Sequence, residues 1–197
     1  MKFLRALTAA FLFVSLAACS TMRVRHYKEY WCGWQTLSYN REQLQTGDIL
    51  VVKREYNPIG FVGHAAVVLE KGEIGEYPKV GSTYWKGPTY VWLYERSEMV
   101  VLRYRHFTPQ FKERFLENAA KLKNGYWAFS LDKKNNQVFY CSQYVWYLYY
   151  ASAKDLGYNL DLDANGGLLV LPYDFIGNDE LMPLRFEREF PREFGTK

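Results

Sequence analysis

The sequence has few of the residues that build metal and redox centres, with only three cysteines and three histidines among its 197 residues. None of them shows paired ligand spacing such as C-x-x-C or H-x-x-x-H, so a zinc site would need ligands from distant parts of the chain. Glycine-rich phosphate loops and dinucleotide fingerprints are also missing. We therefore expect no metal and no cofactor.

Neither positive nor negative charge is in large excess, with 25 lysines and arginines against 21 aspartates and glutamates. The formal net charge is +4, and two of the positive charges are Lys2 and Arg5 in the N-terminal leader described below. No block of lysine and arginine dominates any segment, whereas nucleic-acid binding needs a basic surface that neutralises phosphates. We therefore expect no nucleic-acid partner, and the sequence leaves the oligomeric state open.

The N-terminal residues 1–18 contain two basic residues followed by an apolar run. This apolar run is too short to span a bilayer as a helix. This is the layout of a signal peptide for secretion. The end of this segment, "LAAC" at Leu16–Cys19, resembles the lipobox of bacterial lipoproteins. The resemblance implies that Cys19 is acylated, and Ser20 after it implies an outer-membrane lipoprotein, which we expect to face the periplasm. An ordinary cleavage site beside an incidental cysteine is the alternative.

The rest of the chain has the length and composition of one domain, with 49% hydrophobic and 18% aromatic residues. We assign residues 19–45 to a tether and N-terminal segment that ends in a short helix and a turn, and residues 46–197 to the folded domain. Residues 81–87 are expected to form a loop, and the tail from residue 161 to be largely irregular. β-Branched and aromatic runs predict strands at 48–55, 64–70, 74–80, 89–95 and 99–106. Helices are predicted over 109–124, with Thr108 as cap and Pro109 as first residue, and over 141–154.

Cys141 stands where the second of these helices begins, inside the aromatic segment "QVFYCSQYVWYLYYA" (137–151). Unpaired backbone N–H groups and the helix dipole stabilise negative charge in a first turn, so they favour the thiolate form of a cysteine placed there. A nucleophilic thiolate also needs a base, normally a histidine. His64 opens a predicted strand after a glycine-containing loop and is the best candidate, since His26 lies in the tether and His106 lies beside a helix cap.

Four motifs occur in a characteristic order: "GDILVV", "GHAAVVLEKGEIGEY", "FYCSQYVWYLYY" and "LPYDF". Over roughly residues 47–175 they resemble the motifs of the permuted papain-like amidases of the YaeF/YiiX type, which are relatives of the NlpC-type cysteine peptidases. The resemblance implies an α+β, circularly permuted papain-like (NlpC-like) fold. In that fold a small antiparallel, barrel-like sheet carries the histidine and a helix presents the cysteine. The resemblance also implies the chain order histidine, polar residue, cysteine, which this sequence has.

The third catalytic group implied by the resemblance is a glutamate on the strand after the histidine strand, and Glu76 takes the matching place. Because side chains alternate along a strand, Glu76 shares a face with Ile74, whereas Glu73 points the other way and is the alternative. The backbone N–H of Cys141 is the expected oxyanion donor. The hydroxyl of Tyr140 is a candidate second donor, with simple packing of its ring as the alternative.

These residues predict a cysteine hydrolase that cleaves an amide bond in a cell-envelope peptide or lipid, through Cys141, His64, Glu76 and a thioester intermediate. Two alternatives stay open. The same site could serve a lipid acyltransferase or thioesterase. A Cys32–Cys141 disulfide, which an oxidising compartment permits, would instead leave a non-catalytic, envelope-binding lipoprotein.

Overall fold

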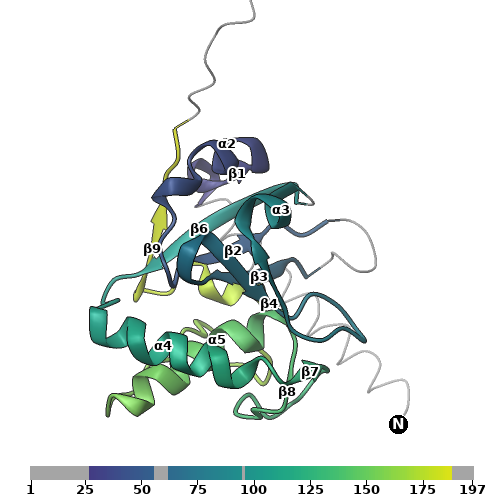
Figure 1. Cartoon of the computed structure of the whole chain (residues 1–197), viewed down its shortest axis with the longest axis vertical. Coiled ribbons are helices and arrows are strands. Elements are labelled where there is room, and N and C mark those ends of the chain that lie inside the picture. Colours follow the sequence, from purple (N-terminus) through teal and green to yellow (C-terminus); the bar gives the residue numbers. More distant parts are fainter. Residues whose placement is uncertain (1–26, 56–61, 95, 188–197) are drawn as a thin grey trace, which may run out of the picture.

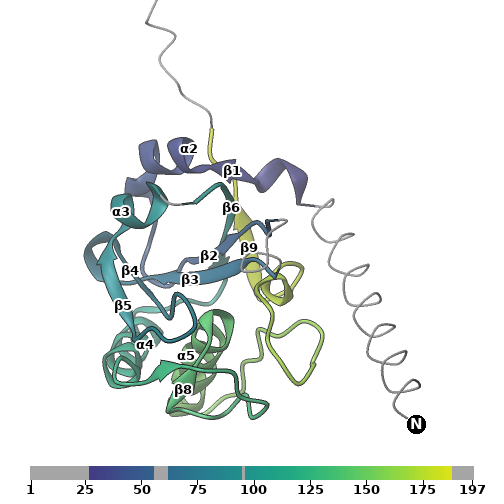
Figure 2. The same cartoon turned by 90° about the vertical axis from the view of Figure 1, so that its right-hand side faces the viewer.

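The computed structural model describes residues 27–55, 62–94 and 96–187. The predicted signal peptide, the predicted lipidation site Cys19 and His26 lie outside the described residues. The described chain has a mixed α+β fold, in which one antiparallel sheet lies between two pairs of helices (Figures 1 and 2).

The main sheet has the strand order β1-β6-β2-β3-β4-β5, with β9 also paired to β6, and every pairing is antiparallel. Strands β2 and β3, β3 and β4, and β4 and β5 are neighbours, so His64 and Glu76 lie on adjacent strands. The strands of this sheet are β1 (Cys32–Gly33), β2 (Ile49–Val52), β3 (His64–Val68), β4 (Glu73–Glu76), β5 (Trp85–Pro88), β6 (Glu98–Tyr104) and β9 (Leu181–Leu184). A second, parallel pair joins β7 (Tyr126–Trp127) and β8 (Val138–Phe139).

Two helices cover each face of the main sheet. Helices α4 and α5 lie side by side against one face, and α2 and α3 lie against the other (Figures 1 and 2). Among the described residues, no helix combines the length and the apolar character needed to cross a bilayer. The helices are α2 (Trp34–Tyr39), α3 (Thr89–Tyr94), α4 (Pro109–Leu122) and α5 (Cys141–Asp155), with 3-10 turns η1 (Lys28–Tyr30), η2 (Arg41–Gln43), η3 (Glu70–Gly72) and η4 (Pro172–Phe175).

Alternation along the strands builds a hydrophobic core on each face of the sheet. In β2, Ile49 and Val51 belong to the core under α4 and α5, whereas Leu50 and Val52 belong to the core under α2 and α3. All four side chains are buried. A strand covered on both faces carries an uninterrupted apolar run, which is why "ILVV" was recognisable as a strand from the sequence.

Local signals set the starts of the two long helices. The side chain of Thr108 accepts a hydrogen bond from the N–H of Phe111 at 3.1 Å, and Pro109 is the first residue of α4, as predicted. Helix α5 begins at Cys141, also as predicted, and ends at Asp155. The candidate nucleophile therefore lies in the first turn of a four-turn helix.

The strand predicted over residues 89–95 is wrong, because residues 89–94 form helix α3. The β-branched and aromatic content of this segment favours a strand. Its buried residues are Thr89, Trp92 and Leu93, however, and their spacing of three and four is that of one helix face. Packing of this face against the sheet outweighs the intrinsic preference of the residues.

Two strands were not predicted: β5, which overlaps the expected loop 81–87, and β9, in the tail expected to be irregular. Both contain a proline, Pro88 and Pro183, and a proline cannot donate a ladder hydrogen bond. Both strands lie where that loss is tolerated, since β5 ends the strand order and β9 pairs with β6 alone. The predicted strand 74–80 is shorter than expected and ends at Glu76.

Residues 27–45, assigned from the sequence to the tether and N-terminal segment, contain β1 and α2. Strand β1 pairs with β6, and Leu37 of α2 is completely buried. This part of the chain is therefore packed onto the sheet.

The Gly47–Asp48 pair of the first motif anchors the start of β2. The Asp48 carboxylate is fully buried and accepts two hydrogen bonds from the Arg103 guanidinium, each 2.7 Å long, and one from the N–H of Gln45 at 2.8 Å. Gly47 has φ 89°, and a Cβ at this position would lie 2.2 Å from the ring of Phe107. Both residues of the motif thus have structural reasons to be present.

Candidate active site

Cys141 is the first residue of α5 and follows the buried N-cap residue Tyr140. Backbone N–H groups in the first turn have no acceptor inside the helix, and the helix dipole is positive at this end. Helix α5 packs against β3, whose first residue is His64. The packing of α5 on the sheet therefore brings the thiol to the end of the histidine strand.

The backbone before His64 fixes the position of its side chain. His64 pairs with Val52, the last residue of β2. The preceding Gly63 has φ 78°, and a Cβ on it would lie 2.8 Å from the carbonyl oxygen of Val52. Glycine alone avoids this clash, which gives the glycine in "GHAAVV" a physical role in placing the histidine.

Glu76 is the last residue of β4, and its side chain is 3% exposed. The register of β3 and β4 sets Val67 opposite Gly75. Continuing this register places Glu76 one pleat away from His64 on the same face of the sheet, where diagonal neighbours are within reach of each other. Strand alternation and a short turn thus suffice to bring the carboxylate to the imidazole.

The structure brings the three predicted residues together. The Glu76 carboxylate is hydrogen-bonded to Nε2 of His64, which leaves Nδ1 for the second partner of the ring. The imidazole also interacts with Cys141, since each of the two groups shifts the pKa of the other. His64 therefore bridges a sulfur from α5 and a carboxylate from β4.

The charges in this cluster stabilise one another. Burial by itself lowers the pKa of His64, but the Cys141 thiolate and then the Glu76 carboxylate outweigh it and raise the pKa to about 9. Burial raises the pKa of Cys141, but His64, with smaller effects from the N–H of Ala65 and the hydroxyl of Ser142, lowers it overall. This arrangement favours a thiolate–imidazolium pair, the ionisation state that a nucleophilic cysteine needs.

Two residues outside the four sequence motifs, Arg96 and Trp92, lie beside Glu76. Arg96 follows α3, and its Nη2 lies 3.4 Å from Oε1 of Glu76, while its guanidinium carbon lies 4.9 Å from the centroid of the Trp92 ring. Burial raises the pKa of Glu76, but His64 and then Arg96 lower it overall. The indole N–H of Trp92 contributes to the lowering from close by, outside hydrogen-bond geometry. Neither residue belongs to a motif, so no sequence signal marked them.

Tyr140 and Ser142, the two neighbours of Cys141, both bind Val170. The hydroxyl of Tyr140 accepts a hydrogen bond from the N–H of Val170 at 2.9 Å, and the hydroxyl of Ser142 donates to its carbonyl oxygen at 2.7 Å. These bonds hold the segment around Val170 beside the start of α5. Tyr140 therefore has a packing role, and its role as an oxyanion donor stays a prediction.

The alternative candidates have other partners. Glu73 forms an ion pair with Lys86 of β5 at 2.6 Å. The side chain of His106 is 71% exposed and lies 3.9 Å from Glu180. The carboxylate that is hydrogen-bonded to His64 is therefore that of Glu76 and not that of Glu73.

Cys32 and Cys141 are both free cysteines in the structure, so the disulfide considered from the sequence is not formed. The thiol of Cys32 donates to the carbonyl oxygen of Met99 at 3.6 Å, within the core under α2 and α3. Helix α5 packs on the opposite face of the sheet. The two cysteines therefore have separate partners in this structure, Met99 for Cys32 and His64 for Cys141.

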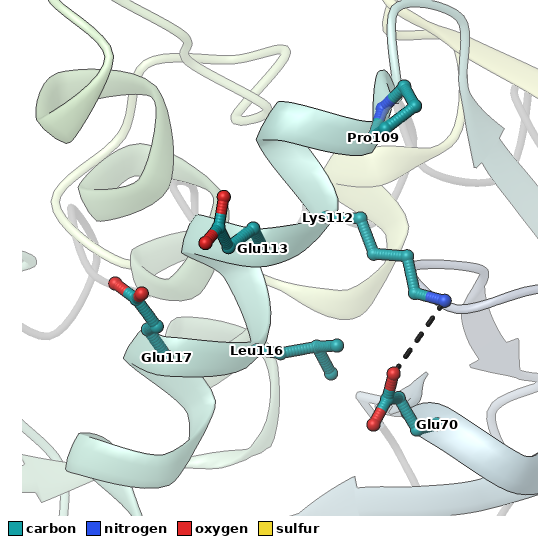
Figure 3. Close-up of a pocket in the computed structure, with 6 residues that line it drawn as sticks. All are labelled: Glu70, Pro109, Lys112, Glu113, Leu116 and Glu117. Carbon is teal, nitrogen blue, oxygen red and sulfur yellow. Dashed lines mark ion pairs between the residues drawn. The ribbon is translucent and has the colours of Figure 1, made fainter.

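A surface pocket of about 410 Å³ lies along α4 (Figure 3). In Figure 3, Lys112 reaches towards Glu70, and the two charged groups are 3.7 Å apart. None of the residues that line it is a predicted site residue, so this pocket is not part of the candidate active site. Its lining residues are Glu70, Pro109, Lys112, Glu113, Leu116 and Glu117.

No protein-family model and no curated protein matches the chain. Among solved structures, the metalloprotein YiiX from Escherichia coli O157:H7 is similar, with a TM-score of 0.55, 17% sequence identity, and coverage of 74% of this chain and 98% of the YiiX chain. Within the ranges of this chain that the structure describes, no group of three or more His, Cys, Asp or Glu side chains is arranged to hold a metal ion. The resemblance inferred from the four motifs is confirmed at the level of the fold: this chain has the fold of a YiiX-type protein.

Proposed function

We propose that this protein is a cysteine hydrolase that cleaves an amide bond through Cys141, His64 and Glu76, in a circularly permuted papain-like fold. The observation that carries the proposal is the position of His64, which is hydrogen-bonded to a buried carboxylate and lowers the pKa of a cysteine at a helix start. Covalent catalysis by a thiol requires a nucleophile, a base beside it and a group that orients the base. The likeness to YiiX supports the proposal as an analogy of fold.

In the first half of the reaction, the Cys141 thiolate, whose proton is held by His64, attacks the carbonyl carbon of the amide. A carbon–sulfur bond forms, and the carbonyl oxygen becomes an oxyanion that the N–H of Cys141 is placed to stabilise. The carbon–nitrogen bond then breaks as His64 gives its proton to the leaving amine. The product of this half is a thioester on Cys141 and a free amine.

In the second half, His64 takes a proton from water, and the hydroxide attacks the thioester carbon. The carbon–sulfur bond breaks, a carboxylic acid leaves, and the Cys141 thiolate beside protonated His64 is restored. Glu76 accepts a hydrogen bond from Nε2 of His64 in both halves, so Nδ1 stays directed at the reacting atoms.

The proposed site of action is the cell envelope. Acylation of Cys19 would tether the protein to the outer membrane, on its periplasmic side, close to peptide and lipid amides. Replacing Cys19 with serine should move the protein from the membrane fraction to the soluble fraction, and unchanged membrane association would contradict lipid anchoring at this residue.

Hydrolysis is tested with purified, detergent-solubilised protein and a panel of peptidyl and fatty-acyl p-nitroanilides and p-nitrophenyl esters. Cys141→Ala should lose about 10³-fold or more of the activity, and Cys32→Ala is the matched control that should keep it. Intact-mass spectrometry should detect an acyl adduct at Cys141 in the wild-type protein. Equal rates in wild type and Cys141→Ala would contradict the proposal, and transfer of the acyl group to an added amine would identify an acyltransferase.

A further inference from the structure

Glu76 is held from both sides by cationic groups. One carboxylate oxygen bonds to Nε2 of His64, and the other faces Nη2 of Arg96 at 3.4 Å. The Glu76 side chain is only 3% exposed, and a buried carboxylate stays ionised only when charges and hydrogen bonds replace its lost hydration.

Arg96 is itself fixed in place by α3. Its guanidinium carbon lies 4.9 Å from the centroid of the Trp92 ring, close enough for a cation–π interaction. Trp92 is 3% exposed and belongs to the core under α2 and α3, so the ring cannot move without disturbing that core. The backbone N–H of Arg96 also donates a hydrogen bond to the carbonyl oxygen of Leu93 at 3.0 Å, which closes the turn after α3. Helix α3 therefore presents a cation to the carboxylate of the candidate active site.

We propose that Arg96 is a positioning residue, which holds the carboxylate form of Glu76 in place against the imidazole of His64. This inference rests on the proposed function, since the cluster has a base to orient only if Cys141 is a nucleophile. Besides burial, the groups that shift the pKa of His64 are Cys141 and Glu76. The groups that shift the pKa of Cys141 are His64, Ala65 and Ser142. Arg96 thus acts on the base through Glu76.

The titratable groups that face Glu76 come from four parts of the fold. His64 comes from β3, Cys141 lies beyond it on α5, Arg96 follows α3, and Tyr84 precedes β5. Burial is the main cause that raises the pKa of Tyr84, and Glu76 adds a smaller contribution. Within the described chain, the cations that contact the Glu76 carboxylate are His64 and Arg96.

Loss of the Arg96 charge should make Glu76 easier to protonate. An opposite charge within about 4–6 Å lowers the pKa of a carboxyl group by about 1–3 units, so its removal raises that pKa. Protonated Glu76 no longer stabilises imidazolium, and without imidazolium the Cys141 thiolate takes up a proton. The pH at which the thiolate is lost should therefore be higher in a variant that lacks the charge.

The test is the rate of iodoacetamide alkylation at Cys141 as a function of pH, measured by peptide mass spectrometry on the detergent-solubilised full chain. In Arg96→Gln the acid limb of the profile should move up by about one pH unit or more. Arg96→Lys keeps a positive charge and should move by less than half as much. Arg114→Gln is the matched control, because Arg114 pairs with Glu117 on α4 at 2.6 Å, and its profile should equal that of the wild type.

The outcomes separate this inference from the proposed function. A wild-type profile with a lowered thiol pKa, together with an unshifted Arg96→Gln profile, would overturn the role of Arg96 and leave the proposed function standing. Equal shifts in the Gln and Lys variants would also overturn it, because a role that depends on charge predicts unequal shifts. A wild-type pKa near the ordinary thiol value of about 8.5 would contradict the proposed function itself. If Arg96→Gln does not fold, as judged by circular dichroism, Arg96→Met is tested by the same criteria, since its thioether can pack on Trp92.

Discussion

Replacement of Cys141 with serine should lower the pKa of His64, because it removes the anion that contributes most to keeping the imidazole protonated. The pKa of His64 lies at about 9, against an ordinary value of 6.5. At about 1.4 kcal/mol per pH unit, this difference corresponds to roughly 3 kcal/mol of preference for the imidazolium form.

The contributions to this shift set the size of the expected effect. Cys141 raises the pKa of His64 more than Glu76 does, while burial acts against both. Since serine does not ionise in this range, Cys141→Ser should lower the pKa of His64 by more than about one unit.

Proton NMR of the imidazole ring, followed from pH 5 to 10, measures this change, with assignment by a His64→Gln variant. His106 has a side chain that is 71% exposed and serves as an internal reference. A His64 signal that titrates at the same pH in wild type and Cys141→Ser would refute the thiolate–imidazolium pair. An equal shift of the His106 signal would indicate a change throughout the protein instead of a change at His64.

Two further predictions concern the residues that support the site. Asp48→Ala should lower the free energy of unfolding by about 3 kcal/mol, because it leaves the Arg103 guanidinium without the carboxylate to which it makes two hydrogen bonds of 2.7 Å. We expect the lower end of the range for broken buried ion pairs, since the Arg103 side chain is 23% exposed. Urea unfolding monitored by tryptophan fluorescence measures this loss, and an unchanged midpoint would contradict the anchoring role of Asp48. Tyr140→Phe leaves the buried N–H of Val170 without its acceptor and should cost about 1–3 kcal/mol in the same assay. It should leave alkylation of Cys141 unchanged, whereas a loss of hydrolysis by about 10²-fold in the folded variant would assign the hydroxyl an oxyanion role.

The parts of the fold that the sequence predicted correctly depend on short-range signals. Thr108 and Pro109 mark the start of α4, and the apolar run of β2 reflects burial on both faces. Alternation of side chains along a strand places Glu76 on the face of the sheet where it meets His64. These features are encoded within a few residues of one another, so a single sequence is enough to recognise them.

The parts that were missed depend on the rest of the fold. The residues of α3 prefer a strand, and only the helical spacing of Thr89, Trp92 and Leu93 fits the surface that they cover. Strands β5 and β9 contain prolines and are stable only because their neighbours place them at edges of the sheet. Arg96 reaches the candidate active site because α3 packs where it does, and an isolated arginine after a wrongly predicted strand carries no such information.

The pH dependence of Cys141 alkylation, with and without His64→Ala, tests the central claim most directly, because it measures the ionisation of the proposed nucleophile without a substrate. Our account predicts a pKa for Cys141 below the ordinary thiol value of about 8.5, which rises towards that value when the imidazole is removed. A value near 8.5 in both proteins would contradict the claim that His64 activates Cys141.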